Sequence, residues 1–190
     1  MKIYETKVEA GTKQWLKIPV DEECSLKAAA FCGSRPGKRL IVTAGVHGCE
    51  YIGILAVSRL IQELDPRQMK GEVVFLPIAN EGGFYKEIKQ LVPEDGVNLN
   101  RAFPGTEMGS RSAKIAAAVE TYLYPDADFL VDLHSGDIHE MVVPFAFFPV
   151  AAGETVEKKA AAAARAMSLS WRVASTAKNG LYSWAAQKGI

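Results

Sequence analysis

Runs of β-branched and aliphatic residues alternate with helix-periodic segments along most of this 190-residue chain. From Lys38 onward the β-rich runs are short and apolar, and the segments between them repeat their apolar residues at helical spacing. The predicted strands are 38–44, 73–78, 128–132, 142–148 and 171–175, and the predicted helices are 51–64, 111–123, 154–167 and 181–187. Such alternation places helices on the faces of a largely parallel sheet. We therefore predict an α/β fold.

The remaining segments fit a single domain. Short strand-like runs cover 2–8, 15–20 and 25–31, and a Gly- and Pro-containing turn at 33–37 separates them from the alternating region. The stretch from Asn80 to Gly109 is rich in glycine and proline and has little periodicity, which in a compact domain usually indicates function. Because we find no internal repeat and no linker, one domain over 1–190 is expected.

The charge, hydropathy and cysteine content of the chain indicate which partners and which compartment to expect. The 22 basic and 22 acidic residues cancel, and without a long basic run neither nucleic acid nor an anionic membrane surface is expected as a partner. No apolar stretch approaches a membrane span of about 20 residues, and the charged N-terminus lacks the apolar core of a signal peptide. Three cysteines at irregular spacing favour reduced thiols in a cytoplasmic protein.

Candidate metal ligands follow two of the predicted strands. His47 and Glu50 come directly after 38–44, and His134 comes directly after 128–132. In open α/β sheets, ligands gather at the carboxyl ends of strands, so these side chains should meet. Two imidazoles and a carboxylate are a common set for hydrolytic zinc, although cobalt, manganese or iron would also be accepted.

Each half of this pattern has a plainer interpretation. A His-x-x-Glu pair also arises by chance at the start of a helix, and a single histidine at a strand end could serve only packing. Their joint placement at two strand ends favours the metal site. Asp132 shares a face with His134 on an extended chain and could orient it, whereas His139 is expected on a surface loop.

A candidate anion-binding pair lies in the irregular stretch. Arg101 stands between turn residues and an aromatic, in Asn98-Leu99-Asn100-Arg101-Ala102-Phe103-Pro104-Gly105. Arginine binds carboxylates through two parallel hydrogen bonds, and Asn100 can add a neutral one. An ion pair with a nearby surface acid is the competing interpretation, and the long irregular loop argues for binding.

Taken together, the segments Gly45–Glu50, Asn98–Gly105 and Asp132–Gly136 resemble the succinylglutamate desuccinylase and aspartoacylase family of the zinc carboxypeptidase superfamily. The resemblance extends from about Lys38 to the C-terminus. It implies a three-layer α/β/α sandwich around a mixed, mainly parallel sheet. It also implies one zinc ion held by His47, Glu50 and His134, a substrate carboxylate bound by Asn100 and Arg101, and hydrolysis of an amide in a small carboxylate-bearing substrate.

Two features depart from the family pattern. The family's general base is a glutamate on a strand after the helix that 181–187 resembles, and it is not found within 1–190, since Glu154 and Glu157 fall on a predicted surface helix. The chain is therefore expected to be an N-terminal portion that binds zinc and hydrolyses little by itself. The family also has an arginine shortly before the Asn-Arg pair, where this chain offers Lys86, Lys89 and Gln90.

Three functions remain open from the sequence: a deacylase of N-acyl amino acids, a zinc carboxypeptidase acting on peptides, and a zinc- and anion-binding domain without catalysis. The acyl group, the amino acid released and the oligomeric state are also left open.

Overall fold

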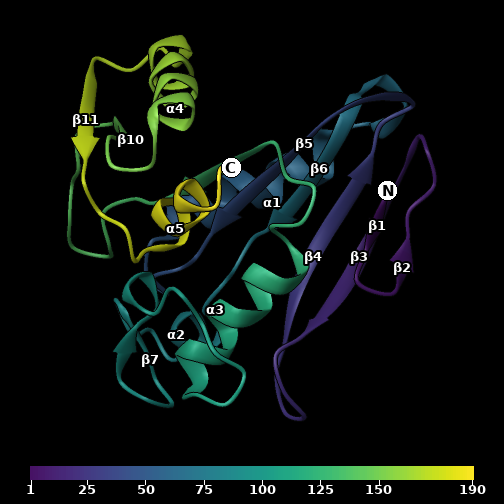
Figure 1. Ribbon diagram of the computed structural model, residues 1–190. Coiled ribbons are helices and arrows are strands. Elements are labelled where there is room, and N and C mark those ends of the chain that lie inside the picture. The colour runs from purple at the N-terminus through teal and green to yellow at the C-terminus, as the bar shows by residue number, and fades with distance from the viewer.

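A five-stranded sheet forms the centre of the computed structural model, which describes residues 1–190 (Figure 1). Its strand order is β3-β4-β6-β5-β9, and the strands are β3 (Thr12–Pro19), β4 (Ser25–Cys32), β5 (Arg35–Ala44), β6 (Lys70–Leu76) and β9 (Phe129–Leu133). β4 is antiparallel to β3 and β6, whereas β5 is parallel to β6 and β9. The other four strands therefore share one direction, which confirms the predicted α/β fold with a mixed, mainly parallel sheet.

The second part of β5, from Arg39 to Ala44, is largely buried because helices cover both faces of the sheet. Leu40 pairs with Val73 of β6 on one side and with Phe129 of β9 on the other. Ile41 and Val42 point to opposite faces and are 0% and 7% exposed. A continuous Leu-Ile-Val run is the composition expected of a parallel strand buried on both faces.

The two faces are covered by different helices, which gives three layers (Figure 1). On one face, α1 (Tyr51–Glu63) packs Ile54, Val57 and Ile61 against Phe31 and Phe75 of the sheet. On the other face lie α3 (Arg111–Tyr122) and α5 (Leu181–Gln187), whose apolar side chains join the larger core cluster. The predicted helices 51–64, 111–123 and 181–187 are thus confirmed within one residue at their ends.

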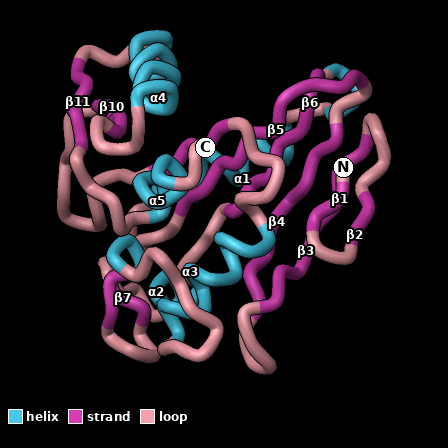
Figure 2. The backbone as a smooth tube through the Cα atoms, viewed as in Figure 1, coloured by secondary structure: helices cyan, strands magenta, loops and turns pink.

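The predicted strands 142–148 and 171–175 form a separate two-stranded sheet. β10 (Phe145–Pro149) and β11 (Trp171–Ser175) pair in parallel, and α4 (Glu154–Ala166) connects them and packs on β10. This unit stands apart from the five-stranded sheet in the ribbon and tube views (Figures 1 and 2). β10 begins three residues later than predicted, because Val142 and Val143 lie in the preceding loop.

Two other expectations were wrong in detail. The run 2–8 is a hairpin of β1 (Lys2–Ile3) and β2 (Thr6–Lys7), reversed at Tyr4, whose φ is 50°. The stretch 80–109 is less irregular than predicted. It contains α2 (Glu81–Tyr85), a hairpin of β7 (Leu91–Val92) and β8 (Val97–Asn98), and the 3-10 turn η2 (Leu99–Arg101).

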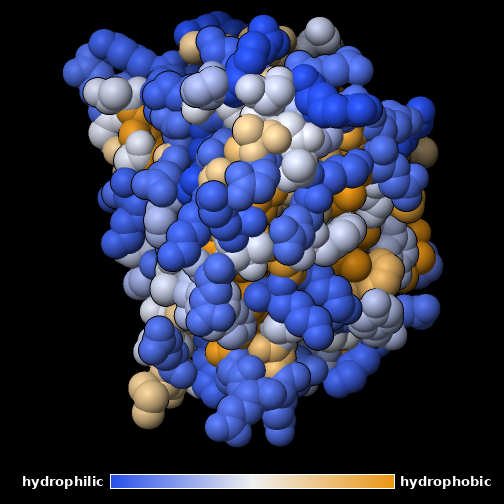
Figure 3. All heavy atoms as spheres, turned by 90° about the vertical axis from the view of Figure 1, so that its right-hand side faces the viewer, coloured by the Kyte–Doolittle hydropathy of each residue, from blue (hydrophilic) through white to orange (hydrophobic).

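The surface beside the N-terminal strands is mainly hydrophilic, with hydrophobic side chains interspersed among polar ones (Figure 3). A further 3-10 turn, η1 (Pro66–Gln68), connects α1 to β6. No helix combines the length and the apolar character needed to cross a bilayer.

Candidate metal centre

The parallel pairing of β5 with β9 brings the predicted metal ligands together. Ala44 at the end of β5 pairs with Leu133 at the end of β9, so the loops that follow start side by side. His47 lies in the first loop, Glu50 is the residue preceding α1, and His134 comes directly after β9. The expectation that two strand ends would bring these three side chains together is met by the geometry.

Glu50 lies between the two imidazoles. Its Oε1 is 2.7 Å from Nδ1 of His47, and its Oε2 is 2.7 Å from Nδ1 of His134. The ring centroids of the histidines are 5.0 Å apart. One ligand atom from each of the three residues lies within 4.8 Å of the others, so the same atoms could converge on one cation.

Glycines permit this loop to fold so tightly after β5. Gly45 has a φ of +63°, which side chains rarely adopt, and it starts the turn. Gly48 packs on the backbone of α2, where a Cβ atom would lie 2.2 Å from the carbonyl carbon of Gly83. Any larger residue at Gly48 would push apart the loop that carries His47 and Glu50.

Each histidine has a second partner on its outer nitrogen. His134 Nε2 lies 2.8 Å from Oδ2 of Asp132, whose Oδ1 accepts the hydroxyl of Thr43 at 2.6 Å. His47 Nε2 lies 3.1 Å from Oδ1 of Asn98. Such outer partners fix the tautomer and ring orientation of metal-ligating histidines. The geometry thus supports an orienting role for Asp132.

Asn98 is the site residue for which the sequence predicted no role. Its Oδ1 accepts the backbone N–H of Asn100 at 2.8 Å as well as contacting His47. It therefore links the candidate metal ligands to the candidate anion-binding pair. The only sequence signal for a role of Asn98 is its place in the same short segment as Asn100 and Arg101. The direction of its side chain depends on the local turn of that segment.

The pKa values of the ligand cluster follow from these contacts. Burial would raise the pKa of Glu50, but hydrogen bonds from His134 and His47 outweigh burial and lower it to about 2. Burial would lower the pKa of His134, but the charge of Asp132 and the hydrogen bonds that the ring donates to Asp132 and Glu50 raise the pKa to about 10. His134 thus lies between two carboxylates, and a cation bound by these ligand atoms would displace protons from the histidines.

The donor set suits a zinc ion. Two imidazole nitrogens and a carboxylate are borderline ligands that zinc accepts, and three protein ligands leave a further coordination position open. Both Nδ1 atoms already face the same carboxylate, and both Nε2 atoms are held by outer partners. His139, the remaining histidine, is exposed in the loop after the cluster, as expected.

Arg101 lies three residues beyond Asn98, at the end of η2, and its side chain is exposed. One of its nitrogens, Nη1, donates to the backbone oxygen of Asn100 at 2.7 Å, and the guanidinium forms no ion pair with an acid of the chain. Arg101 therefore does not pair with a surface acid, which was the competing interpretation. Asn100 Oδ1 accepts the N–H of Leu181 at 2.9 Å, which leaves its amide N–H groups as possible donors to a ligand.

The acids and cations that the sequence considered for catalysis are engaged elsewhere. Glu154 pairs with Lys158 on α4, and Glu157 accepts the N–H groups of Ala152 and Gly153 before that helix. Lys89 pairs with Asp137 at 2.9 Å. In the stretch before Asn100, Lys86 pairs with Glu94. None of these contacts involves the ligand cluster.

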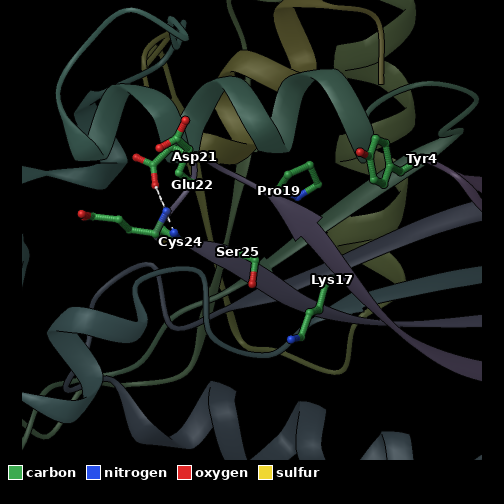
Figure 4. A pocket seen from close by; sticks show the side chains of 8 residues that line it. Tyr4, Lys17, Pro19, Asp21, Glu22, Cys24 and Ser25 are labelled. Carbon is green, nitrogen blue, oxygen red and sulfur yellow. Dashed lines mark hydrogen bonds between the residues drawn. The ribbon is translucent and has the colours of Figure 1, made fainter.

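A separate hollow of about 220 Å³ lies around the turn between β3 and β4 (Figure 4). Of its three acidic residues, Asp21 is bound by Arg111 at 2.6 Å and by Lys114 at 3.3 Å. The three cysteines are unpaired, and Cys24, which lines this hollow, has a pKa raised by burial. Nothing in this hollow belongs to the metal cluster.

Two histidines and a carboxylate meet at the carboxyl ends of parallel strands on an α/β/α sandwich, and Asn98 connects them to the segment that carries the exposed Arg101. Residues 36–188 match the family model of the succinylglutamate desuccinylase/aspartoacylase catalytic domain. The chain therefore belongs to this family, as its motifs predicted.

Similar proteins agree with this assignment. The chain is 35% identical over 137 residues to N-alpha-acetyl-L-2,4-diaminobutyric acid deacetylase of Halomonas elongata, a match that covers 70% of this chain and 40% of that protein. A succinylglutamate desuccinylase from Silicibacter superposes with a TM-score of 0.81 at 27% identity over 94% of this chain and 56% of that one. The product-bound ectoine utilization protein EutE of Ruegeria pomeroyi gives 0.78 at 26% identity, with the same coverage. The chain thus spans about half the length of these relatives.

Proposed function

We propose that this chain supplies the zinc-binding and carboxylate-binding parts of a hydrolase that cleaves the amide bond of an N-acyl amino acid. The observation that carries the proposal is the position of Asn98, whose Oδ1 meets both His47 Nε2 and the N–H of Asn100. One side chain thereby joins the proposed metal ligands to the segment that presents Arg101. A substrate with an amide next to a carboxylate would fit such a pairing.

Separate residues would bind the metal, orient its ligands and bind the substrate. His47, Glu50 and His134 would hold zinc, and a bound zinc ion supplies Lewis-acid activation of water and of an amide carbonyl. Asp132 and Asn98 orient the two imidazoles through their Nε2 atoms. Arg101, aided by the amide N–H groups of Asn100, would bind the substrate carboxylate and align its amide with the metal site. We assign no residue within 1–190 as the general base.

The names of the relatives favour N-acyl amino acids over peptides. The Halomonas elongata protein is named for deacetylation of N-alpha-acetyl-L-2,4-diaminobutyric acid, and the Silicibacter protein is named a succinylglutamate desuccinylase. In both names the acyl group is small and the amino acid keeps its free carboxylate. We therefore propose a small N-acyl amino acid as the substrate class.

Zinc binding can be tested on the 190-residue chain alone. Zinc at about 100 times its dissociation constant should stabilise the chain by about 2.7 kcal/mol, and a chelator should reverse the shift. His134→Ala should abolish the zinc-dependent rise in melting temperature, whereas the matched control His139→Ala should retain it. A chain that binds no zinc, or a His134→Ala variant that binds it normally, contradicts the proposal.

Activity is tested on a longer polypeptide as well, made by appending the C-terminal part of the Halomonas elongata deacetylase to this chain. Release of the free amine from N-acetyl-L-2,4-diaminobutyrate is compared with cleavage of short peptides. We expect the fusion to deacylate and the 190-residue chain to be nearly inactive. Faster peptide cleavage would favour a carboxypeptidase, and zinc binding without turnover of either substrate would favour a non-catalytic domain.

Arg101 has its own test in the same fusion. Arg101→Ala should raise KM for the N-acyl amino acid, and Arg101→Lys should recover only part of the loss, because lysine cannot form two parallel hydrogen bonds to a carboxylate. Zinc affinity should not change in either variant. An unchanged KM in Arg101→Ala would place carboxylate recognition elsewhere.

A further inference from the structure

The segment 98–105, which contains Arg101, is held in part by contacts to residues 179–181. Leu181 at the start of α5 donates its N–H to Asn100 Oδ1 at 2.9 Å, and Phe103 donates its N–H to the oxygen of Asn179 at 3.3 Å. Gly180 approaches so closely that a Cβ atom there would lie 2.4 Å from Asn100 Oδ1. The start of α5 is therefore one of the elements that position the segment.

One carboxylate connects the far end of this segment to α5. Glu120, in the last turn of α3, accepts the N–H of Gly105 on Oε1 at 2.6 Å. Its Oε2 accepts the indole N–H of Trp184 in α5 at 2.7 Å. Both oxygens of a half-buried carboxylate are thus used, one by the segment and one by the helix.

The packing around Gly105 leaves no room for a side chain that could take over the contact between Glu120 and the Gly105 N–H. The backbone of Gly105 lies directly on α3, where a Cβ atom would be 2.0 Å from the nitrogen of Ala117. No side chain can be added at Gly105 to anchor the loop, so its N–H is the group available for anchoring. Hydrogen bonds to an ionised acceptor are about twice as strong as neutral ones.

We propose that Glu120 is a positioning residue that sets Arg101 for carboxylate binding by holding Gly105 and Trp184 in fixed relation. Glu120 does not itself contact the ligand cluster or the guanidinium. The proposal rests on the proposed function for the role of Arg101. It goes beyond that function by making the α3–α5 contact a determinant of substrate affinity.

The test compares Glu120→Gln and Trp184→Phe with the surface control Glu63→Gln. Glutamine can accept only one of the two N–H groups, and phenylalanine removes only the indole donor. In the zinc-loaded 190-residue chain, the dissociation constant for N-acetyl-L-2,4-diaminobutyrate is measured by NMR titration. Both bridge variants should raise it about three- to tenfold, because each loses one hydrogen bond to a charged group. The zinc dissociation constant should stay at the wild-type value in all three.

A second readout does not depend on ligand binding. Amide hydrogen exchange at Gly105 and Leu181, and the side-chain Nε–H resonance of Arg101, should change in Glu120→Gln and Trp184→Phe but not in Glu63→Gln. If the wild-type chain fails to bind the probe, the proposed substrate is wrong, while this readout still decides the role of Glu120. Unchanged exchange and resonance would overturn the positioning role. A loss of both zinc affinity and stability in the bridge variants would also overturn it. The same holds if exchange becomes faster but the dissociation constant for the probe stays at the wild-type value.

Discussion

Asn98 Oδ1 lies 3.1 Å from His47 Nε2, and the same oxygen accepts the backbone N–H of Asn100 at 2.8 Å. The amide oxygen of Asn98 contacts the outer nitrogen of His47, and Nδ1 of the same ring faces Glu50 at 2.7 Å. The candidate metal ligands and the candidate anion-binding segment therefore share one hydrogen-bond acceptor.

Asn98→Ala should weaken zinc binding by about 10- to 100-fold, the usual cost of losing an outer partner of a metal-ligating histidine. Zinc affinity is measured by competition with a chromogenic chelator. Gln62→Ala, an exposed amide on α1, is the control and should bind zinc normally. Asn98→Asp keeps an acceptor for His47 and should retain most of the affinity. Wild-type affinity in Asn98→Ala would mean that His47 needs no orientation from this side chain.

Thr43→Val should destabilise the chain by about 1–3 kcal/mol, because the buried carboxylate of Asp132 loses one of its hydrogen bonds. Thr43 is 0% exposed, and its hydroxyl donates to Asp132 Oδ1 at 2.6 Å. The free energy of unfolding is measured by urea denaturation, with Thr155→Val on the exposed side of α4 as the matched control. Equal stability of the two variants would show that Thr43 does not support Asp132.

Much of the ligand cluster was predictable because it depends on strand ends. The apolar runs that become β5 and β9 are recognisable, and two parallel neighbours deliver their loops to one edge of the sheet. His47, Glu50 and His134 therefore follow from placement alone. Asn98 does not, because its direction depends on the short turn η2, and turns of this kind leave no periodic pattern in the sequence.

The pairing of distant elements was also beyond the sequence. The runs 142–148 and 171–175 identify two strands, but periodicity specifies which residues share a face, not which strand is the neighbour. Only the structure shows that β10 and β11 pair with each other apart from the main sheet. Likewise, Glu120 and Trp184 are 64 residues apart, and each alone looks like an ordinary helix residue.

The free energy of unfolding should fall modestly as the pH is lowered, because Asp21 becomes protonated. A hydrogen bond from Arg111 lowers its pKa to about 2. The pKa of an aspartate in the unfolded chain is about 3.9. The ion pair therefore stabilises the folded chain fully above about pH 4 and loses this effect as the pH falls toward about 2. Thermal melts at a series of pH values should show a shallower loss over this range in Asp21→Asn. The difference should be about 1 kcal/mol, since the pair is partly exposed. Glu22→Gln in the same turn should keep the wild-type slope, and an identical slope in Asp21→Asn would contradict the assignment.

Gly48→Ala tests whether the close packing of the β5 loop on α2 holds the metal ligands in place. A Cβ atom at Gly48 would lie 2.2 Å from the carbonyl carbon of Gly83, so one of the two backbones must move. We expect a loss of about 1–3 kcal/mol in the free energy of unfolding, as for other overpacked sites. Because His47 and Glu50 flank this position, zinc affinity should fall more than stability alone explains. For Gly82→Ala in the neighbouring helix, the nearest atoms to the new Cβ belong to the flexible side chain of Glu94, at 3.0 Å, and to the ring of Pro93, at 3.3 Å. It should keep both zinc affinity and stability, since alanine favours a helix over glycine. If Gly48→Ala lost stability but bound zinc as tightly as Gly82→Ala, the ligand loop would have to be positioned by contacts other than this one.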